Sequence, residues 1–254
     1  MTKRITYKSL RKFNLIAGGL HFVQGVIIVL ISKSFAVPIT GSYLAFNKST
    51  QQLDPASTTL FHIQLPWLIA AFFFLSAVAH LIVATVCNKW YVRNLKHGIN
   101  KARWIEYALS ASIMMIAIGL LVGIYDAASL FMIFLLVSTM NLMGLMMEVH
   151  NQTTQKTSWL SFAIGTRAGL APWVVVAFYM WLGAHNGSRA PAFVYWIFVS
   201  IFVFFSCFAI NMILQYKKIG PWKDYLYGER AYIILSLVAK SLLAWQVFAG
   251  TLRP

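Results

Sequence analysis

Charged residues are scarce in this sequence, and acidic residues are the scarcest of all. Only 6 of the 254 residues are Asp or Glu, and charged residues make up 11% of the chain, whereas soluble domains carry roughly a quarter. This shortage excludes a water-soluble globular protein. The only two cysteines, Cys87 and Cys207, fall in apolar runs without metal-site spacing. They exclude a disulfide framework and a cysteine metal site.

Most of the sequence is apolar. The chain is 59% hydrophobic and 15% aromatic, with a mean hydropathy of +0.70. A helix that spans a bilayer needs about 20 mostly apolar residues, and seven stretches meet this requirement: residues 15–31, 65–87, 104–124, 127–147, 159–183, 192–216 and 231–250. We therefore predict an all-α membrane protein, a seven-helix bundle that forms a single domain over residues 1–254.

The basic residues are divided unevenly between the two ends of the predicted helices. One end has only Lys33, Lys48, Arg189 and Arg253, whereas the N-terminal end has Lys3, Arg4, Lys8, Arg11, Lys12, Lys89, Arg93, Lys96, Lys101, Arg103, Lys156, Lys217, Lys218, Lys223 and Arg230. Cytoplasmic loops carry the Lys/Arg excess, so we expect a multi-pass protein of the cell membrane with a cytoplasmic N-terminus and an extracellular C-terminus. The net charge of +15 sits in short patches next to the lipid bilayer, which excludes a soluble nucleic-acid binder.

One connection between predicted helices is much longer than the others. Residues 34–64 separate the first two apolar stretches, and the segment 35–46 mixes β-forming residues with Pro38 and Gly41. We predict a short external β-ribbon over about residues 35–61. It could cap the bundle or pair with a second copy through its edge, and simple loop packing remains an equal alternative.

Lys240 is the most informative residue, because a charge deep in a bilayer is costly and marks a functional site by default. It lies eleven residues after Glu229, which places it about 16 Å from the N-terminal end of the bundle at 1.5 Å per residue. A lysine at that depth must be neutral, paired with a carboxylate, or chemically converted, as in a Schiff base with an aldehyde.

Four further polar residues are expected at a similar depth. Glu106 lies about 8 Å in, His21 and His80 lie about 13 Å in, and Ser236 precedes Lys240 by one helical turn. Each alone has an ordinary explanation, such as a serine bonded to its own backbone. Together they predict a hydrated, proton-handling pocket around Lys240.

A second polar group is expected near the N-terminal end of the bundle. Arg167 and Glu148 can join Arg103 and His150 there. We interpret this set as an ion pair that braces helix ends.

Three segments resemble the heliorhodopsins, an inverted branch of the retinal-binding rhodopsins. They are GERAYIILSLVAKSLLAWQVFAGTL at 228–252, RWIEY at 103–107 and FAVPITGSYL at 35–44. The resemblance implies that Lys240 forms a protonated Schiff base with all-trans retinal, with Glu106 as counterion and Ser236 beside the nitrogen. It also implies a proton-accepting cavity at His21 and His80, a chromophore pocket lined by Trp104, Met140, Gly144 and Phe205, and a homodimer formed through the ribbon. For the four lining residues, plain apolar packing is the competing interpretation.

The residues favour a light sensor with a slow photocycle over a pump, and a photoreceptor over an enzyme. Pumps of the rhodopsin type generally have a carboxylate where this chain has Ser236, and no Asp or Glu follows Lys240. A light-gated proton channel is the nearest alternative. A retinal-free seven-helix zinc hydrolase is a remote one, because only His21 and His80 lie within the membrane and catalytic zinc needs three protein ligands. The basic loops leave room for a cytoplasmic signalling partner, although topology alone explains them.

Overall fold

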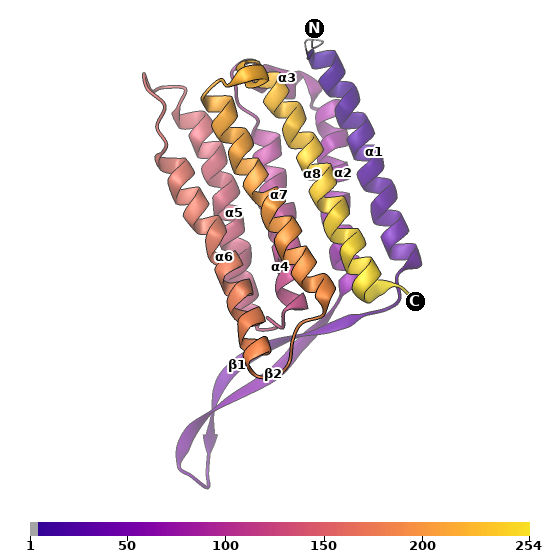
Figure 1. The fold of residues 1–254 in the computed structure, drawn as a ribbon, viewed down its shortest axis with the longest axis vertical. Helices are drawn as coiled ribbons and strands as arrows, with labels where there is room; N and C mark the ends of the chain where they lie inside the picture. Colours follow the sequence, from indigo (N-terminus) through magenta and orange to yellow (C-terminus); the bar gives the residue numbers. More distant parts are fainter. Residues whose placement is uncertain (1–4) are drawn as a thin grey trace.

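The computed structural model describes residues 5–254, which form one helical bundle with a β-ribbon at one end (Figure 1). Within this range seven helices are long and apolar enough to cross a membrane. They are α1 (Tyr7–Ile31), α2 (Leu65–Ala84), α4 (Lys101–Leu121), α5 (Ala127–His150), α6 (Leu160–His185), α7 (Ala192–Tyr216) and α8 (Tyr225–Val247), the last continued by a π-helical turn, Phe248–Leu252. The predicted seven-helix architecture is confirmed.

Several helices begin earlier than their apolar stretches do, because polar residues cap them. Thr6 accepts a hydrogen bond from the backbone N–H of Ser9, so α1 begins at Tyr7 and not near residue 15. Asp224 accepts one from Leu226 N–H, so α8 begins at Tyr225 and not near residue 231. Such caps satisfy backbone donors that a helix start leaves free. The basic residues Lys3 and Arg4, assigned above to the N-terminal cluster, lie outside the described residues.

A short helix, α3 (Asn88–Lys96), was not predicted. It connects α2 to α4, and its residues alternate between basic side chains and buried ones such as Tyr91 and Leu95. With nine residues and a polar composition it has no apolar run, which explains why a search for membrane spans misses it. A short 3-10 turn, Gly220–Lys223, likewise precedes α8.

The β-ribbon consists of two antiparallel strands, β1 (Ala36–Asn47) and β2 (Gln52–Gln64), and is slightly longer than the predicted 35–61. It projects beyond the bundle (Figure 1). Its base is held by buried Val37 and Ile39 and by a backbone hydrogen bond of 2.9 Å from Thr40 N–H to Tyr125 C=O. The ribbon is therefore anchored to the segment between α4 and α5.

Buried ionisable side chains are confined to one half of the bundle along the helix axes, whereas apolar clusters occur in both halves. The largest apolar cluster includes Ile39 of the ribbon, Phe72 of α2, Ile118 of α4 and Val247 of α8, and so lies at the ribbon end. The buried ionisable side chains lie in the other half, which we call the N-terminal half: His21, Arg103, Glu106, Glu148, Glu229 and, at its inner limit, Lys240. This arrangement brings the predicted polar layer into one region of the bundle.

Candidate functional site

Lys240 is buried in the middle of α8, with 3% of its surface exposed. Its Nζ donates a 2.7 Å hydrogen bond to Ser236 Oγ, one helical turn earlier, and lies 3.2 Å from Glu106 Oε1 on α4. The ring of Tyr107 lies beneath the amine, with 5.2 Å between Nζ and the ring centroid. A buried amine thus has a carboxylate and a hydroxyl as partners, which is what a desolvated positive charge requires.

Glu106 is held by a residue that the sequence did not single out. Ser76 of α2 donates a 2.6 Å hydrogen bond to Glu106 Oε1, the same oxygen that faces Lys240. The serine hydroxyl therefore helps to hold the carboxylate in its ionised form. Ser76 lies four residues before His80, on the same face of α2, and this spacing is the signal that could have identified it.

The two histidines lie beside this pair. The rings of His21 and His80 stack with 5.5 Å between their centroids, and His80 Nδ1 lies 2.7 Å from Asn14 Oδ1. Both ring nitrogens of His21 are buried without a hydrogen-bond partner among the described residues. Asn14 was also missed by the sequence analysis, although it precedes His21 by seven residues and so shares its face of α1.

A cavity of about 150 Å³ begins at Lys240 and Ser236 and extends between α4, α5, α6 and α7. Trp104, Met140, Gly144 and Phe205, the four residues that the resemblance placed around a chromophore, all line it. Tyr107, Asn141 and Trp173 also line it and were not anticipated. Apart from Ser161 and Thr166, the rest of the wall is apolar and aromatic, as expected of a site for a small apolar ligand fixed by a few polar groups.

Two glycines make room for side chains that line this cavity. A Cβ atom on Gly144 would lie 2.5 Å from Cη2 of Trp104, and one on Gly169 would lie 2.9 Å from Cζ of Phe205. Real Cβ contacts are essentially never so short. An apolar cavity that ends at a reactive amine fits retinal, an apolar polyene with a terminal aldehyde.

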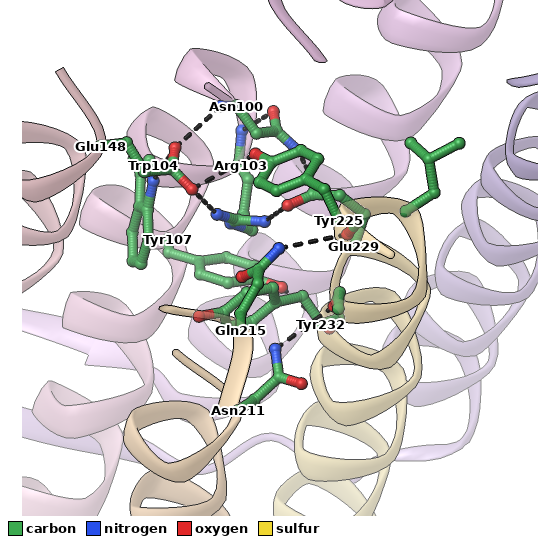
Figure 2. A network of polar contacts seen from close by, with 12 residues as sticks. Asn100, Arg103, Trp104, Tyr107, Glu148, Asn211, Gln215, Tyr225, Glu229 and Tyr232 are labelled. Atoms are coloured by element: carbon green, nitrogen blue, oxygen red, sulfur yellow. Dashed lines mark hydrogen bonds and ion pairs between the residues drawn. The ribbon is translucent and has the colours of Figure 1, made fainter. Parts of the chain in front are cut away.

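A second polar cluster surrounds Arg103 near the N-terminal end (Figure 2). The guanidinium donates to Glu148 Oε1 over 2.5 Å and also binds Glu229 on α8. It lies over the ring of Tyr232, 3.9 Å from the centroid. The predicted ion pair between Arg103 and Glu148 is present, and Glu229 joins it.

Arg167 and His150, which were expected to join this cluster, do not belong to it. Both side chains are exposed and neither forms an ion pair within residues 5–254. Arg167 lies on a face of α6 turned away from the bundle. Glu229, used above only to mark the membrane boundary, takes the place that we had assigned to them.

The described residues contain no group of three or more His, Cys, Asp or Glu side chains that could hold a metal ion. His21 and His80 thus have no third ligand beside them within residues 5–254. Catalytic zinc normally needs three protein ligands, so this part of the chain offers no support for a zinc hydrolase.

Seven membrane-competent helices, a buried lysine on the last of them, a carboxylate partner and an adjoining apolar cavity define a retinal-binding rhodopsin. The family model for heliorhodopsins matches residues 10–252, nearly the whole chain. The chain therefore belongs to the heliorhodopsin family. No curated protein matches it.

Proposed function

We propose that this heliorhodopsin is a light sensor that binds all-trans retinal through Lys240. The observation that supports this is the position of Nζ, at the end of the apolar cavity and 3.2 Å from Glu106. Condensation of the amine with the aldehyde would form a C=N bond and release one water. When bound, retinal would supply the absorption of visible light and the isomerisation that follows it.

The chain's own residues would then stabilise the charge at Lys240 and handle its proton. Glu106 would act as the counterion, because it is the one carboxylate in contact with the amine within residues 5–254. Ser236 would orient the nitrogen through its 2.7 Å hydrogen bond. His80, which lines the cavity next to Glu106, and the buried His21 stacked on it would form part of the region that accepts the proton. Trp104, Met140, Gly144 and Phe205 would hold the polyene in place.

We propose a sensor with a slow photocycle, and not a pump, because the buried ionisable side chains lie on only one side of Lys240 along the bundle axis. A pump needs ionisable groups on both sides of the chromophore, and from Ser241 to Val247 the last helix has none. The supporting observation is that the described core of the ribbon end is apolar. A light-gated proton channel remains the competing function.

The test is a visible absorption spectrum of the full chain reconstituted with all-trans retinal, with Lys240→Ala and Lys156→Ala as paired variants. We expect a visible band in the parent and in Lys156→Ala, and none in Lys240→Ala. A band that survives in Lys240→Ala would overturn the assignment. Photocurrent recording under voltage clamp then decides between sensor and channel, since sustained light-driven current contradicts a sensor.

We further propose that the N-terminus is cytoplasmic, as the distribution of basic residues indicates. The test replaces Cys87 and Cys207 with Ser and introduces one cysteine at Lys156 or at Lys48. A membrane-impermeant maleimide added to intact cells should label Lys48→Cys and not Lys156→Cys. The reverse pattern would contradict the orientation.

We also propose that the ribbon joins two copies of the chain. Leu44, Phe46, Leu53 and Pro55 share one face of the ribbon, because Leu44 pairs with Pro55 and Phe46 with Leu53 in the strand register. The three larger side chains are all more than half exposed. An exposed apolar face of this kind marks an interaction surface, and the second copy is the occupant that the family resemblance suggests.

A further inference from the structure

The cluster around Arg103 contains more negative than positive charge. Glu148 and Glu229 are 2% and 1% exposed, and both bind the same guanidinium. No other cation pairs with either carboxylate among residues 5–254. If both were ionised, the buried cluster would carry one uncompensated negative charge. Buried carboxylates in that situation share a proton, because like charges at close range cannot both ionise.

The hydrogen bonds around the two carboxyl groups differ. Glu148 accepts from Arg103 Nη2, from Asn100 N–H, from Trp104 Nε1 and, over 3.3 Å, from Tyr225 OH. Four donors leave an ionised carboxylate well satisfied. Glu229 accepts from Arg103 and from Asn100 Nδ2 alone.

The side chain of Asn100 is fixed in the orientation that makes it a donor to Glu229. Its Oδ1 accepts the backbone N–H of Arg103 over 3.0 Å at the start of α4, so its Nδ2 faces Glu229, 2.5 Å from Oε2. Each oxygen of Glu229 thus accepts one hydrogen bond and keeps a second lone pair, which can carry a proton. Glu148 does not have this freedom.

A second cavity, of about 40 Å³, lies between Glu229 and two neighbours of Lys240, although Lys240 itself does not line it. Glu229, Asn100 and Arg103 line one part of it, and Glu106 and His80 line another. Glu148 does not line it. A cavity of this size with several polar side chains in its lining has room for water, and such water can carry protons between Glu229 and the Glu106–His80 pair.

The other titratable groups around the pair are tyrosines. They are Tyr107 of α4, Tyr225 and Tyr232 of α8, Tyr216 of α7 and Tyr91 of α3. Burial, together with the nearby Glu229, raises the pKa of the Tyr91 hydroxyl. Tyr91 therefore stays neutral at the edge of the second cavity, and Arg103 remains the cation of the cluster.

We propose that Glu148 and Glu229 share one proton in the resting protein, and that Glu229 exchanges it with the cavity leading to Glu106 and His80. The pair is thus a proton-binding site. It needs no bound retinal for its resting state. Its use during illumination, as a proton donor towards Glu106 and His80, rests on the proposed function.

The composition of the chain allows a selective test. It contains three glutamates, Glu106, Glu148 and Glu229, so ¹³C-glutamate labelling marks these three side chains and no aspartate. We would record infrared spectra of the retinal-free full chain in lipid at neutral pH, in H₂O and in D₂O. A protonated carboxyl gives a C=O band that shifts both with ¹³C and with D₂O.

We expect one such band in the parent and in Glu106→Gln. We expect it to disappear in Glu148→Gln and equally in Glu229→Gln, because each variant leaves one carboxylate against one guanidinium and so removes the need for a proton. No labelled band in the parent, or a band that survives in both variants, would overturn the proposal. Gln is isosteric with a protonated Glu, so both variants should fold. If either fails to fold, the parent spectrum still decides whether a glutamate is protonated.

Because retinal is absent from this experiment, its outcome is independent of the proposed function. A labelled band without any retinal binding would sustain the proton site and reject the sensor. A visible retinal band without a protonated glutamate would support retinal binding and overturn the shared proton.

Discussion

Gly144 of α5 lies directly against the ring of Trp104 of α4, so closely that a Cβ atom would come 2.5 Å from Cη2. The same indole donates a 2.7 Å hydrogen bond from Nε1 to Glu148 Oε2. One side chain therefore lines the cavity at Lys240 and supports the Arg103 cluster. A change at Gly144 must disturb both.

We predict that Gly144→Ala lowers the stability of the protein by about 1–3 kcal/mol, the usual cost of overpacking a filled core. It should also shift the visible absorption maximum by moving Trp104 against the chromophore. Thermal unfolding in detergent and a visible spectrum measure the two effects. The matched control is Gly19→Ala on α1, where a Cβ meets nothing within 4 Å. Because Ala is a better helix former than Gly, Gly19→Ala should not lower the stability, and an equal loss at Gly19 would mean that the contact with Trp104 is not responsible.

Removal of the hydroxyl of Ser76 should act mainly on Glu106. We predict that Ser76→Ala costs about 1.5–3 kcal/mol, because it removes a hydrogen bond to a charged group, and that it shifts the absorption maximum by altering the counterion. Ser112→Ala is the control, since Ser112 donates to the Ala108 and Phe134 carbonyls and not to Glu106. An unchanged spectrum in Ser76→Ala would show that the 2.6 Å contact does not tune the site.

Asp126 should make the anchoring of the ribbon sensitive to acid. It caps α5 through the backbone N–H and the hydroxyl of Ser129, and these hydrogen bonds lower its pKa. A lowered pKa means that the stabilisation is complete above the ordinary value of about 3.9. It is lost as the pH falls through the lowered folded-state pKa. The protection factor for hydrogen exchange at Thr40 N–H, which bonds Tyr125 C=O, should therefore fall at low pH, once the observed rate is divided by the intrinsic rate at each pH.

Two variants of Asp126 separate its charge from its cap. Asp126→Ala should lose about 0.5–2 kcal/mol, the cost of a missing N-cap, and should exchange Thr40 N–H faster even at neutral pH. Asp126→Asn keeps a capping side chain, so it should be nearly as stable as the parent but without the acid dependence. Identical pH profiles for the parent and Asp126→Asn would assign the effect to another group.

The ribbon face should decide the oligomeric state. We predict that Leu44→Lys and Leu53→Lys each convert a dimer into a chain of 28.7 kDa, as measured by light scattering after size exclusion in detergent. Tyr43→Lys is the control, because Tyr43 pairs with Ala56 on the opposite face. A parent that is already monomeric in lipid nanodiscs would reject the proposed dimer.

The helices could be predicted because apolarity over about 20 residues has essentially one structural outcome in a membrane. Their beginnings could not, since Thr6 and Asp224 extend α1 and α8 by polar caps that a hydropathy pattern does not contain. The depth of each residue along its helix was sufficient to predict that Lys240 and Glu106 lie close together. Depth alone does not give the direction in which a side chain points, so Arg167 was expected to face inwards and does not.

The place of Glu229 on the buried face of α8 could have been predicted from its spacing in the sequence. Glu229 precedes Ser236 by seven residues and Lys240 by eleven, and both spacings return to the same face of a helix. A search for polar residues at these intervals would have placed it on the buried face of α8. Its pairing with Arg103 depends on the packing of α4 against α8, which no spacing within one helix provides.

The uneven placement of ionisable side chains has an electrical consequence. Towards the ribbon end from Lys240, Glu106 and His21, the remaining turns of α8, α4 and α1 contain no ionisable Asp, Glu, Lys, Arg or His. A transmembrane voltage falls mainly across such a low-dielectric region, where a full crossing is worth about 2.3 kcal/mol per elementary charge for each 100 mV. A proton that enters from the N-terminal side crosses little of that drop. The proton occupancy of the buried groups therefore follows the pH of the compartment at the N-terminal side and hardly changes with the membrane potential.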